Sequence, residues 1–433
     1  MSTLVKFPVV VIGAGPVGLA TAANLVERGL SFLVLEAGER VAASMSDWGH
    51  VRLFTPWSYL VDPASQRLLE AEGTWLSPDP QGVPLAKELV HDYLDPLSKL
   101  GSIEPNLRLH HRVVAVGREG HDRMKDGHPE DRSTKPFIVT VDTPDGRARI
   151  KASAVIDASG TWTTPNPMGA GGVAAAGESE FGAHIRYGMP DVLGAERQRY
   201  EGKRVLVVGS GHSAIGSVIN LAALAKESED TLVAWGIRGD NPRKLWGGGA
   251  ADGVKARGAL GTTVHQAVVD GSITLLTALS IGALREHPEG IAVVDVDERP
   301  RVVVDEIIVA TGARPNLEML RELRTEFDVP TESSKALGPM IDPNHHSCGS
   351  VRPHGAAELA HPEKDFYIVG MKSYGRAPTF LLMTGYEQVR SVVAELAGDH
   401  EAARHVELVL PETGVCSTDL AHGETAAATG GCC

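Results

Sequence analysis

The sequence predicts an α/β protein, because an apolar strand, a glycine-rich turn and a helix follow one another at two separate places. The first such unit has its strand at residues 8–12 and its turn at 13–18. The second has its strand at 203–208 and a turn that begins at Gly209. A strand that leads directly into a helix is typical of parallel sheets covered by helices. The repeated unit therefore predicts two related domains.

The composition is that of a globular protein, and it excludes several classes of function. Hydrophobic residues make up 42% of the 433 residues and charged residues 22%, so cores of normal size are expected. The formal net charge is −14, so nucleic acid is not expected as the main partner. Four cysteines are too few for a disulfide framework, which predicts reduced thiols and a cytoplasmic location.

One uncharged stretch, residues 7–26, is long enough to cross a bilayer. It nevertheless contains three glycines and two prolines, and its second half has helical spacing with Asn24 within it. We therefore expect a strand, a turn and a helix here, and no membrane partner.

The remaining elements are short strands with few helices between them. The charged segment 121–134 predicts a solvated hairpin loop, and the Gly-, Ala- and Pro-rich residues 163–200 predict a crossing segment. Residues 412–433 have almost no large apolar groups and predict a mobile tail. Further strands are expected at residues 31–35, 108–116, 136–141, 148–156, 231–237, 302–310 and 365–369, and a helix at 385–396.

The first glycine-rich turn has the pattern of a dinucleotide-binding site. Gly13 allows the tight turn, Gly15 lets a pyrophosphate approach the backbone, and Gly18 lets helix and strand pack closely. Glu36 ends the next strand, where a carboxylate can accept hydrogen bonds from ribose hydroxyls. The alternative is a structural turn without a ligand, which the strand, the helix and the acid together disfavour.

The second turn, Gly209-x-Gly211-x-x-Ala214, differs in the residues that come after the next strand. No acid directly follows Trp235, and Arg238, Arg243 and Lys244 come instead. A ribose 2′-phosphate needs a cation where a 2′-hydroxyl would need a carboxylate, so the pattern favours NADPH over NADH. An ordinary solvated basic loop is the alternative. Because the first turn is followed by an acid and the second by bases, we expect two different nucleotides, and FAD with NADPH is the economical pair.

Six segments carry a resemblance to a known family. They are residues 13–18 (Gly-Ala-Gly-Pro-Val-Gly), 35–40 (Leu-Glu-Ala-Gly-Glu-Arg), 156–160 (Ile-Asp-Ala-Ser-Gly), 202–213, 308–312 (Ile-Val-Ala-Thr-Gly) and 367–370 (Tyr-Ile-Val-Gly). Together they resemble two-dinucleotide-binding-domain flavoproteins of the flavin-containing monooxygenase-like group.

The resemblance implies an FAD-binding Rossmann-like domain with three layers in the order sheet, sheet, helices (ββα). An NADPH-binding Rossmann-like domain is inserted into it. The FAD domain is expected at residues 1–162 and 313–411, the inserted domain at 163–312 and the tail at 412–433. Residues expected to contact FAD are Gly13, Gly15, Pro16, Gly18, Glu36, Arg40, Gly160, Gly312, Gly370 and Thr384. Those expected near NADPH are Gly209, Ser210, Gly211, His212, Ser213, Arg238, Arg243 and Lys244.

Several departures from relatives narrow the reaction. Phe181-Gly-Ala-His184 does not have the spacing of the Phe-x-Gly-x-x-x-His signature, and Phe54 or Thr55 stands where Baeyer–Villiger enzymes tend to carry an acid. Both departures count against ketone oxygenation. Apart from Cys432 and Cys433 in the tail, no two cysteines lie close in the sequence, so the internal redox disulfide of thioredoxin-reductase relatives is absent.

The segment 370–380 is unusually polar for a loop expected beside the flavin. Lys372, Tyr374 and Arg376 are therefore candidates for catalytic residues, with solvent exposure or salt bridging as the alternative. The helix that begins near Thr384 is expected to aim its N-terminus at the flavin, where its dipole would stabilise an anionic reduced ring.

The cysteines suggest a thiophilic ligand. Cys432 and Cys433 are adjacent, and Cys416 or Cys348 could supply a third sulfur to a soft metal or metalloid ion. With the segments 347–355, 373–379 and 412–416, they resemble flavoprotein monooxygenases associated with bacterial arsenic-resistance operons. The alternative is an unstructured end whose cysteines bind nothing specific, and for Cys348 a buried inert thiol.

These observations together predict an NADPH-dependent FAD monooxygenase. It would activate O2 as a C4a-peroxyflavin and oxygenate a soft nucleophile: sulfur, nitrogen or trivalent arsenic. Two alternatives stay open, an NADPH oxidase or reductase that acts on a disulfide, quinone or metal ion, and a metalloid-binding flavoprotein that serves as sensor or carrier. A small-molecule substrate and O2 are the expected partners, and a homodimer is left open.

Overall fold

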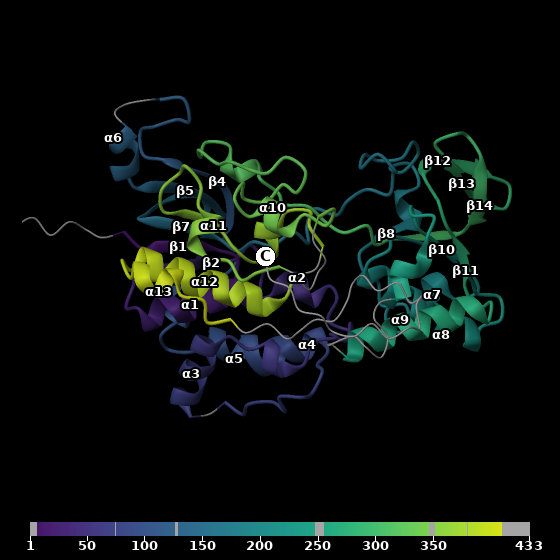
Figure 1. Cartoon of the computed structure of the whole chain (residues 1–433), viewed down its shortest axis with the longest axis horizontal. Helices are drawn as coiled ribbons and strands as arrows, with labels where there is room; N and C mark the ends of the chain where they lie inside the picture. Colours follow the sequence, from purple (N-terminus) through teal and green to yellow (C-terminus); the bar gives the residue numbers. More distant parts are fainter. Residues whose placement is uncertain are drawn as a thin grey trace, which may run out of the picture.

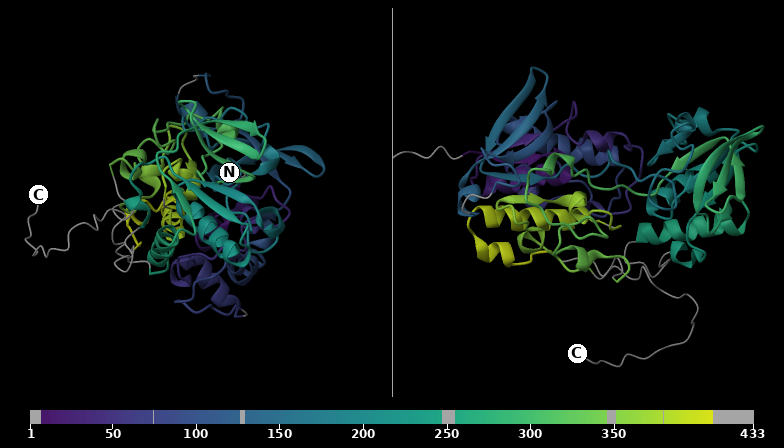
Figure 2. Two further views of the ribbon diagram at one scale, coloured as in Figure 1. Left: turned by 90° about the vertical axis from the view of Figure 1, so that its right-hand side faces the viewer. Right: turned by 90° about the horizontal axis from the view of Figure 1, so that it is seen from above.

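The computed structural model describes residues 7–408 except 74, 126–128, 247–254, 346–350 and 379. Two lobes lie side by side (Figures 1 and 2). The first lobe contains the purple and blue N-terminal segments together with the yellow C-terminal helices, and the second contains teal segments from the middle of the chain (Figure 2). The second lobe is therefore an insertion in the sequence of the first.

Five parallel strands form the main sheet of the first lobe, in the order β16-β7-β1-β2-β3. The central strand is buried along its whole length, as its run of valine and isoleucine predicts for a sheet covered on both faces. The five strands are β1 Val9–Ile12, β2 Phe32–Leu35, β3 Leu107–Arg108, β7 Ala154–Asp157 and β16 Phe366–Ile368.

The main sheet is the middle layer of three. Val9 and Val11 point to one face and pack in a cluster with residues of α1 and α12. Val10 and Ile12 point to the other face and pack with Phe137 of a three-stranded antiparallel sheet. The predicted ββα layering is therefore confirmed. The elements are α1 Pro16–Glu27, α12 Leu382–Leu396, β4 Arg112–Arg118, β5 Phe137–Thr143 and β6 Gly146–Ala152.

The second lobe repeats this plan with a parallel sheet in the order β11-β10-β9-β15-β8. Val205 and Val207 pack in a cluster with α8, and Leu206 and Val208 pack toward the antiparallel sheet β12-β13-β14. Its strands are β8 Ile185–Tyr187, β9 Arg204–Val208, β10 Leu232–Gly236, β11 Thr274–Leu276, β12 Ile281–His287, β13 Gly290–Asp295, β14 Pro300–Val304 and β15 Glu306–Val309.

Most of the remaining helices are short and lie at the edges of the lobes (Figure 1). They are α2 Ala43–Ser46, α3 Pro63–Glu72, α4 Ala86–Leu89, α5 Asp95–Ser98, α6 Pro129–Thr134, α7 Arg197–Tyr200, α8 His212–Glu227, α9 Lys255–Val269, α10 Gly338–Ile341, α11 Ala356–Leu359 and α13 His400–Arg404, with a π-helical turn η2 Val90–Leu94 and 3-10 turns η5 Pro242–Trp246 and η8 Gly370–Tyr374. None of the described helices combines the length and the apolar character that a membrane crossing requires.

Two of the predicted strands are each two strands in the structure. The segment 148–156 contains β6, a corner at Ser153 and β7, and the segment 302–310 contains β14, a corner at Asp305 and β15. In each case the first half closes an antiparallel sheet and the second half enters a parallel one. The second half of each segment is fully buried, whereas the first half is mostly exposed in β6 and partly buried in β14.

Two predicted loops are also more ordered than expected. The segment 121–134 includes α6, and Arg132 within it is buried and ion-paired with Glu363 at 2.9 Å, so a fully solvated hairpin loop is wrong. The crossing segment 163–200 contains β8, which pairs in parallel with β15. The predicted mobile tail lies outside the described residues.

The lobes are joined by two chain segments that run beside each other. The amide of Asn166 donates to the carbonyl of Gly312 at 2.9 Å, and the amide of Arg314 donates to the carbonyl of Thr164 at 3.0 Å. These bonds flank an antiparallel bridge between Pro165 and Ala313. The connection is therefore a paired double strand.

Candidate active site

The turn between β1 and α1 has the geometry that its three glycines predict. Gly13 has φ +98°, and a Cβ there would lie 2.9 Å from the carbonyl oxygen of Ala158. A Cβ on Gly18 would lie 2.0 Å from the carbonyl oxygen of Gly13, so only glycine allows this helix to approach the turn. At Gly15, by contrast, nothing lies within 4 Å of that position. The backbone is open where a pyrophosphate would approach it.

Helix α1 presents its N-terminus to this open space. Pro16 occupies the first helical turn, where its missing N–H costs no hydrogen bond, and the first turn contains no acidic residue. The free N–H groups and the positive end of the helix dipole are thus available to an anion.

Glu36 stands directly after β2 and holds the turn in place. Its Oε2 accepts a hydrogen bond from the amide of Ala14 at 2.7 Å, and its Oε1 accepts one from the amide of Gly38 at 2.8 Å. A carboxylate has about four acceptor positions, so two remain for ribose hydroxyls. Glu36 therefore lies where the sequence predicts, next to the glycine turn.

The opposite wall of this site comes from the C-terminal part of the chain. Gly370, with φ +72°, follows β16, and a Cβ there would lie 3.1 Å from Val17 of α1. Gly385, in the first turn of α12, approaches Val17 equally closely. Thr384 beside it is buried. The N-termini of α1 and α12 and the turn after β16 thus converge on one place, as the sequence predicts.

Lys372 is buried and paired, which corresponds to the salt-bridged alternative. Its side chain is 1% exposed, and its Nζ lies 2.7 Å from Oδ2 of Asp157 and 3.0 Å from Oγ of Ser159. Oδ1 of Asp157 in turn accepts hydrogen bonds from the amide and hydroxyl of Ser159. Asp157 pairs in register with Ile12, the last residue before the glycine turn. A buried ion pair therefore lies directly beneath the first turn.

Tyr374 and Arg376 are in different surroundings. Tyr374 is buried, with its ring 5.1 Å from that of Phe380 and 5.5 Å from that of His354. Burial raises the pKa of its phenol, so this group is a proton donor at neutral pH and not a base. Arg376 is exposed, and the Nη2 atom of its side chain lies near Gly172 of the crossing segment. The catalytic roles of Lys372, Tyr374 and Arg376 stay predictions.

Three further predicted FAD contacts lie on exposed or hinge backbone. Gly160 has φ +69° with open space beside it, and Gly312 has φ +85° in the connection between the lobes. Arg40 is exposed and forms an ion pair with Glu39 at 2.9 Å.

The second turn repeats the geometry of the first. Gly209 has φ +135°, and a Cβ there would lie 2.3 Å from the carbonyl oxygen of Ala310. Gly211 has nothing within 4 Å, and the first turn of α8 contains no acid. The indole of Trp235 donates a hydrogen bond to the carbonyl of Gly209 at 2.7 Å and fixes the turn. The turn residues Ser210, His212 and Ser213 are at least partly exposed around it.

The basic residues predicted for a 2′-phosphate come after β10. Arg238 is exposed two residues after the strand ends, and Arg243 is exposed in η5. Lys244 is the next residue of η5. The binding roles of all three stay predictions.

One ring contact joins the second glycine turn to a loop of the first lobe. Phe54, from the loop after α2, lies with its ring 5.0 Å from the imidazole of His212, the first residue of α8. Within the first lobe, the indole of Trp162 donates a hydrogen bond to Oδ2 of Asp47 at 2.8 Å, and its ring centre lies 6.1 Å from that of Trp48. The N-terminus of α8 therefore lies against a loop of the first lobe.

The predicted thiophilic site falls outside the described residues, because Cys348, Cys416, Cys432 and Cys433 all lie in undescribed segments. Within the described ranges, no group of three or more His, Cys, Asp or Glu side chains is arranged to hold a metal ion.

Comparisons with known proteins identify the chemistry of the first site. Residues 8–220, which include the first glycine turn and Glu36, match the family model described as FAD dependent oxidoreductase. The chain is an FAD-dependent oxidoreductase. The open Gly15, the acid-free N-terminus of α1 and the carboxylate of Glu36 fit the pyrophosphate and ribose of FAD, and so support this assignment.

Individual relatives of this oxidoreductase are distant. A putrescine oxidase from Kocuria rosea is 42% identical over 77 residues, which is 18% of this chain and only 13% of that protein. A bacillithiol disulfide reductase from Bacillus cereus has a TM-score of 0.64 at 18% identity, covering 91% of this chain and 99% of its own. An FAD-bound cadaverine monooxygenase from Erwinia amylovora has a TM-score of 0.62 at 15% identity, covering 96% and 100%. These structures share the two-domain fold of this chain.

The sequence predictions miss one part of this site. Asp157 and Ser159 are not among the predicted site residues, although both lie against the glycine turn and bind Lys372. The sequence offers one signal, since Asp157 is an acid at the end of an apolar strand. The sequence alone does not show that Lys372 is its partner.

Proposed function

We propose that this oxidoreductase is an NADPH-dependent monooxygenase that oxygenates a soft nucleophile, with an amine nitrogen as the first candidate. One molecule of O2, one NADPH and one proton are consumed. One oxygen atom bonds to the lone pair of the substrate, the other leaves as water, and NADP+ is released. NADPH supplies the two electrons for the second oxygen atom.

The observation that carries this proposal is the contact between Phe54 and His212. It joins the N-terminus of α8, where the second nucleotide would bind, to a loop of the FAD domain. Hydride transfer requires the donor and acceptor rings to approach to about 3–3.5 Å, so the two nucleotide sites must face each other. A chain with only one nucleotide site would have no need for this interface.

The residues of the chain have separate tasks in this scheme. Gly15 and the N-terminus of α1 would bind the FAD pyrophosphate, and Glu36 would orient the ribose. Gly211 and Arg238 would bind the phosphates of NADPH. FAD, when bound, accepts hydride and passes electrons to oxygen. The N-terminus of α12, with Thr384 in its first turn, would stabilise negative charge on the reduced cofactor.

The positions of the cysteines favour an electron acceptor other than an internal disulfide. Residues 1–347 and 349–415 contain no cysteine, so no cysteine pair lies in the strands and turns that form the FAD site. The cadaverine monooxygenase that shares this fold is named for an amine substrate, which supports nitrogen as the first acceptor to test, before sulfur and trivalent arsenic.

The proposal is tested by following NADPH consumption with purified FAD-loaded protein in air. Diamines, sulfides and arsenite are added one at a time, and O2 uptake, hydrogen peroxide and product are measured together. We expect one class of acceptor to increase NADPH consumption with a matching loss of peroxide. Peroxide equal to NADPH with every acceptor would identify an oxidase, and turnover that needs a disulfide but no O2 would identify a reductase; either result overturns the proposal.

A single variant tests whether the protein uses NADPH in preference to NADH. We expect Arg238→Leu to raise the KM for NADPH by about ten-fold or more, with little change in the KM for NADH, because only NADPH carries the 2′-phosphate. Arg321→Leu is the matched control, since Arg321 is an exposed arginine of the first lobe. Equal effects of Arg238→Leu on both cofactors would contradict the assignment.

A further inference from the structure

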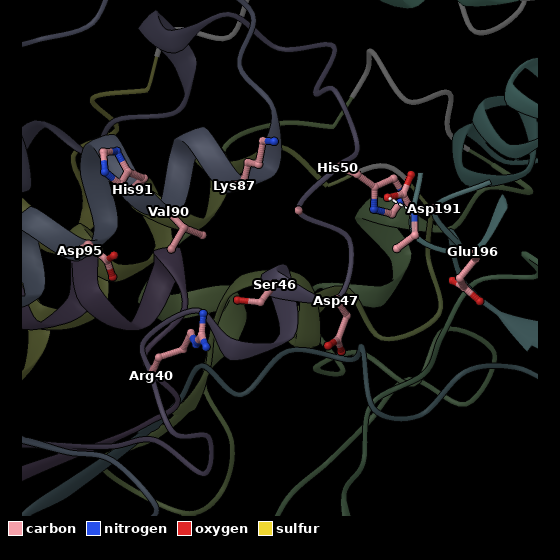
Figure 3. A pocket seen from close by; sticks show the side chains of 12 residues that line it. Arg40, Ser46, Asp47, His50, Lys87, Val90, His91, Asp95, Asp191 and Glu196 are labelled. Carbon is pink, nitrogen blue, oxygen red and sulfur yellow. Dashed lines mark hydrogen bonds between the residues drawn. The ribbon is translucent and has the colours of Figure 1, made fainter. Parts of the chain in front are cut away.

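A polar cavity lies between the lobes, away from the glycine turns. Its volume is about 580 Å³, and its walls come from α2, from the helical segment 86–98 and from the residues between β8 and β9 (Figure 3). Of the residues predicted to contact FAD, only Arg40 lines it; neither glycine turn and no part of the segment 370–385 does. The walls of this space are therefore made by residues other than those of the two glycine turns.

One end of the cavity carries free positive charge. Lys87 and Arg40 reach toward it from α4 and from the loop before α2 (Figure 3). Arg40 is paired only with its neighbour Glu39 among the residues that the structure describes, and the side chain of Lys87 has no hydrogen bond or ion pair within the same ranges. A carboxylate of a ligand would meet the ammonium of Lys87 here, whereas Arg40 already has Glu39 as its partner.

The other end carries three carboxylates, each of which has one oxygen already bonded. Oδ2 of Asp47 accepts from the indole of Trp162 at 2.8 Å, Oδ2 of Asp191 accepts from the amide of Ala195 at 3.0 Å, and Oε2 of Glu196 accepts from Arg186 at 2.9 Å. The protein thus holds these groups in place through one oxygen and leaves the other available to a ligand.

His50 adds an unsatisfied polar atom to the same end. Its Nε2 is fully shielded from solvent and has no hydrogen-bond partner within the described part of the chain. Because this atom has no exposed surface, a ligand in the cavity would meet the charged side chains and not Nε2 of His50.

We propose that this cavity binds a small molecule that carries both a carboxylate and primary ammonium groups, that is, a basic amino acid. The carboxylate would lie at Lys87, and the distal ammonium at Asp47 and Asp191. Glu196 is paired with Arg186 and Arg40 with Glu39, which leaves the carboxylates of Asp47, Asp95 and Asp191 and the ammonium of Lys87 around the cavity, so a ligand with a net positive charge is favoured. The volume is within the usual range of about 300–1,000 Å³ for small-molecule sites.

Binding there would also act on the arrangement of the lobes. Lys87 belongs to the first lobe and Asp191 to the second, so the ligand would connect them and stabilise the arrangement that forms the cavity. This inference needs no particular reaction at the flavin, and it can fail while the proposed function holds.

Isothermal titration calorimetry of the FAD-loaded full chain tests the proposal with three probes of similar length. L-lysine carries both kinds of group, 1,5-diaminopentane has no carboxylate, and glutarate has no ammonium. We expect L-lysine to bind about ten-fold or more tightly than either of the others. No saturable binding of L-lysine, or glutarate binding as tightly as L-lysine, overturns the proposal.

Two variants test which group of the ligand lies at which end of the cavity. Lys87→Met is expected to weaken L-lysine about ten-fold and to leave 1,5-diaminopentane unchanged. Asp191→Asn, which keeps an acceptor for the amide of Ala195, is expected to weaken both amines and to leave glutarate unchanged. Exposed residues outside the cavity give the matched controls Lys99→Met and Asp145→Asn. If Lys87→Met weakens both amines equally, or neither, the proposed orientation is wrong.

Discussion

The ammonium group of Lys372 and the carboxylate of Asp157 are both removed from water, at 1% and 0% exposure. Breaking such a pair by removing one partner typically costs about 3–5 kcal/mol, because the other charge stays buried alone. We therefore expect Lys372→Met and Asp157→Asn each to lower the free energy of unfolding of the apoprotein by about that amount, as measured by urea denaturation.

The two variants should differ in how they bind FAD. Lys372→Met leaves a lone carboxylate beneath the turn that takes the negative pyrophosphate, so FAD affinity should fall about ten-fold or more. Asp157→Asn leaves a lone ammonium there, so the affinity should stay the same or rise. Titration of apoprotein with FAD measures both constants. A purely structural pair would weaken FAD binding in both variants, and the double variant Lys372→Met/Asp157→Leu should restore stability.

Among the secondary-structure elements, the segment between α11 and β16 carries the clearest dependence on pH. His361 packs between Phe327 at 5.2 Å and Phe366 at 5.7 Å between ring centres. Burial lowers the pKa of its imidazole from 6.5 to about 4, because the charged form loses its hydration. The unfolded chain therefore binds the proton more readily than the folded protein does between those two values.

This difference predicts the direction of a pH effect. The contribution of neutral His361 is fully present above pH 6.5 and is lost as the pH falls toward 4. At pH 4.5 the loss is roughly 2–3 kcal/mol. His361→Phe should remove that part of the slope when urea denaturation is compared at pH 7 and pH 4.5. Exposed His91→Gln is the control, and an unchanged slope in His361→Phe would contradict the argument.

Many of the helices, strands and turns follow from the local sequence. The features that the sequence does not predict all depend on contacts between residues far apart in the chain. The turn at 13–18 and the strand before it are predicted because glycine and β-branched residues act locally. The corners at Ser153 and Asp305 are not predicted, because they depend on which sheet each half joins. Burial of Arg132 is not predicted either, since its partner Glu363 is 231 residues away in the chain. The cavity between the lobes depends in the same way on contacts distant in sequence.

At the scale of the whole molecule, the two lobes are copies of one plan with different charges at the corresponding points. In both, the first glycine of the turn lies against the end of the returning strand, Ala158 in one lobe and Ala310 in the other. The first lobe adds the Lys372–Asp157 pair behind its turn, whereas in the second lobe the strand before Ala310 ends in Val309. The copies therefore provide similar backbone for two dinucleotides and different electrostatics for each.

The contact between Phe54 and His212 predicts an effect on the rate at which NADPH reduces the flavin. This prediction rests on the proposed use of NADPH. Phe54→Ala removes the ring that meets His212 across the lobes. We expect the rate of flavin reduction by NADPH, measured by anaerobic stopped-flow absorbance, to fall by about ten-fold or more, because small misplacements of reacting groups are costly. FAD content should be unchanged, since Phe54 lies outside the glycine turn.

Phe181→Ala, which removes a partly buried ring within the second lobe, is the matched control and should keep the original rate. Equal rates in Phe54→Ala and the unmodified protein would mean that the two nucleotides do not meet at this interface.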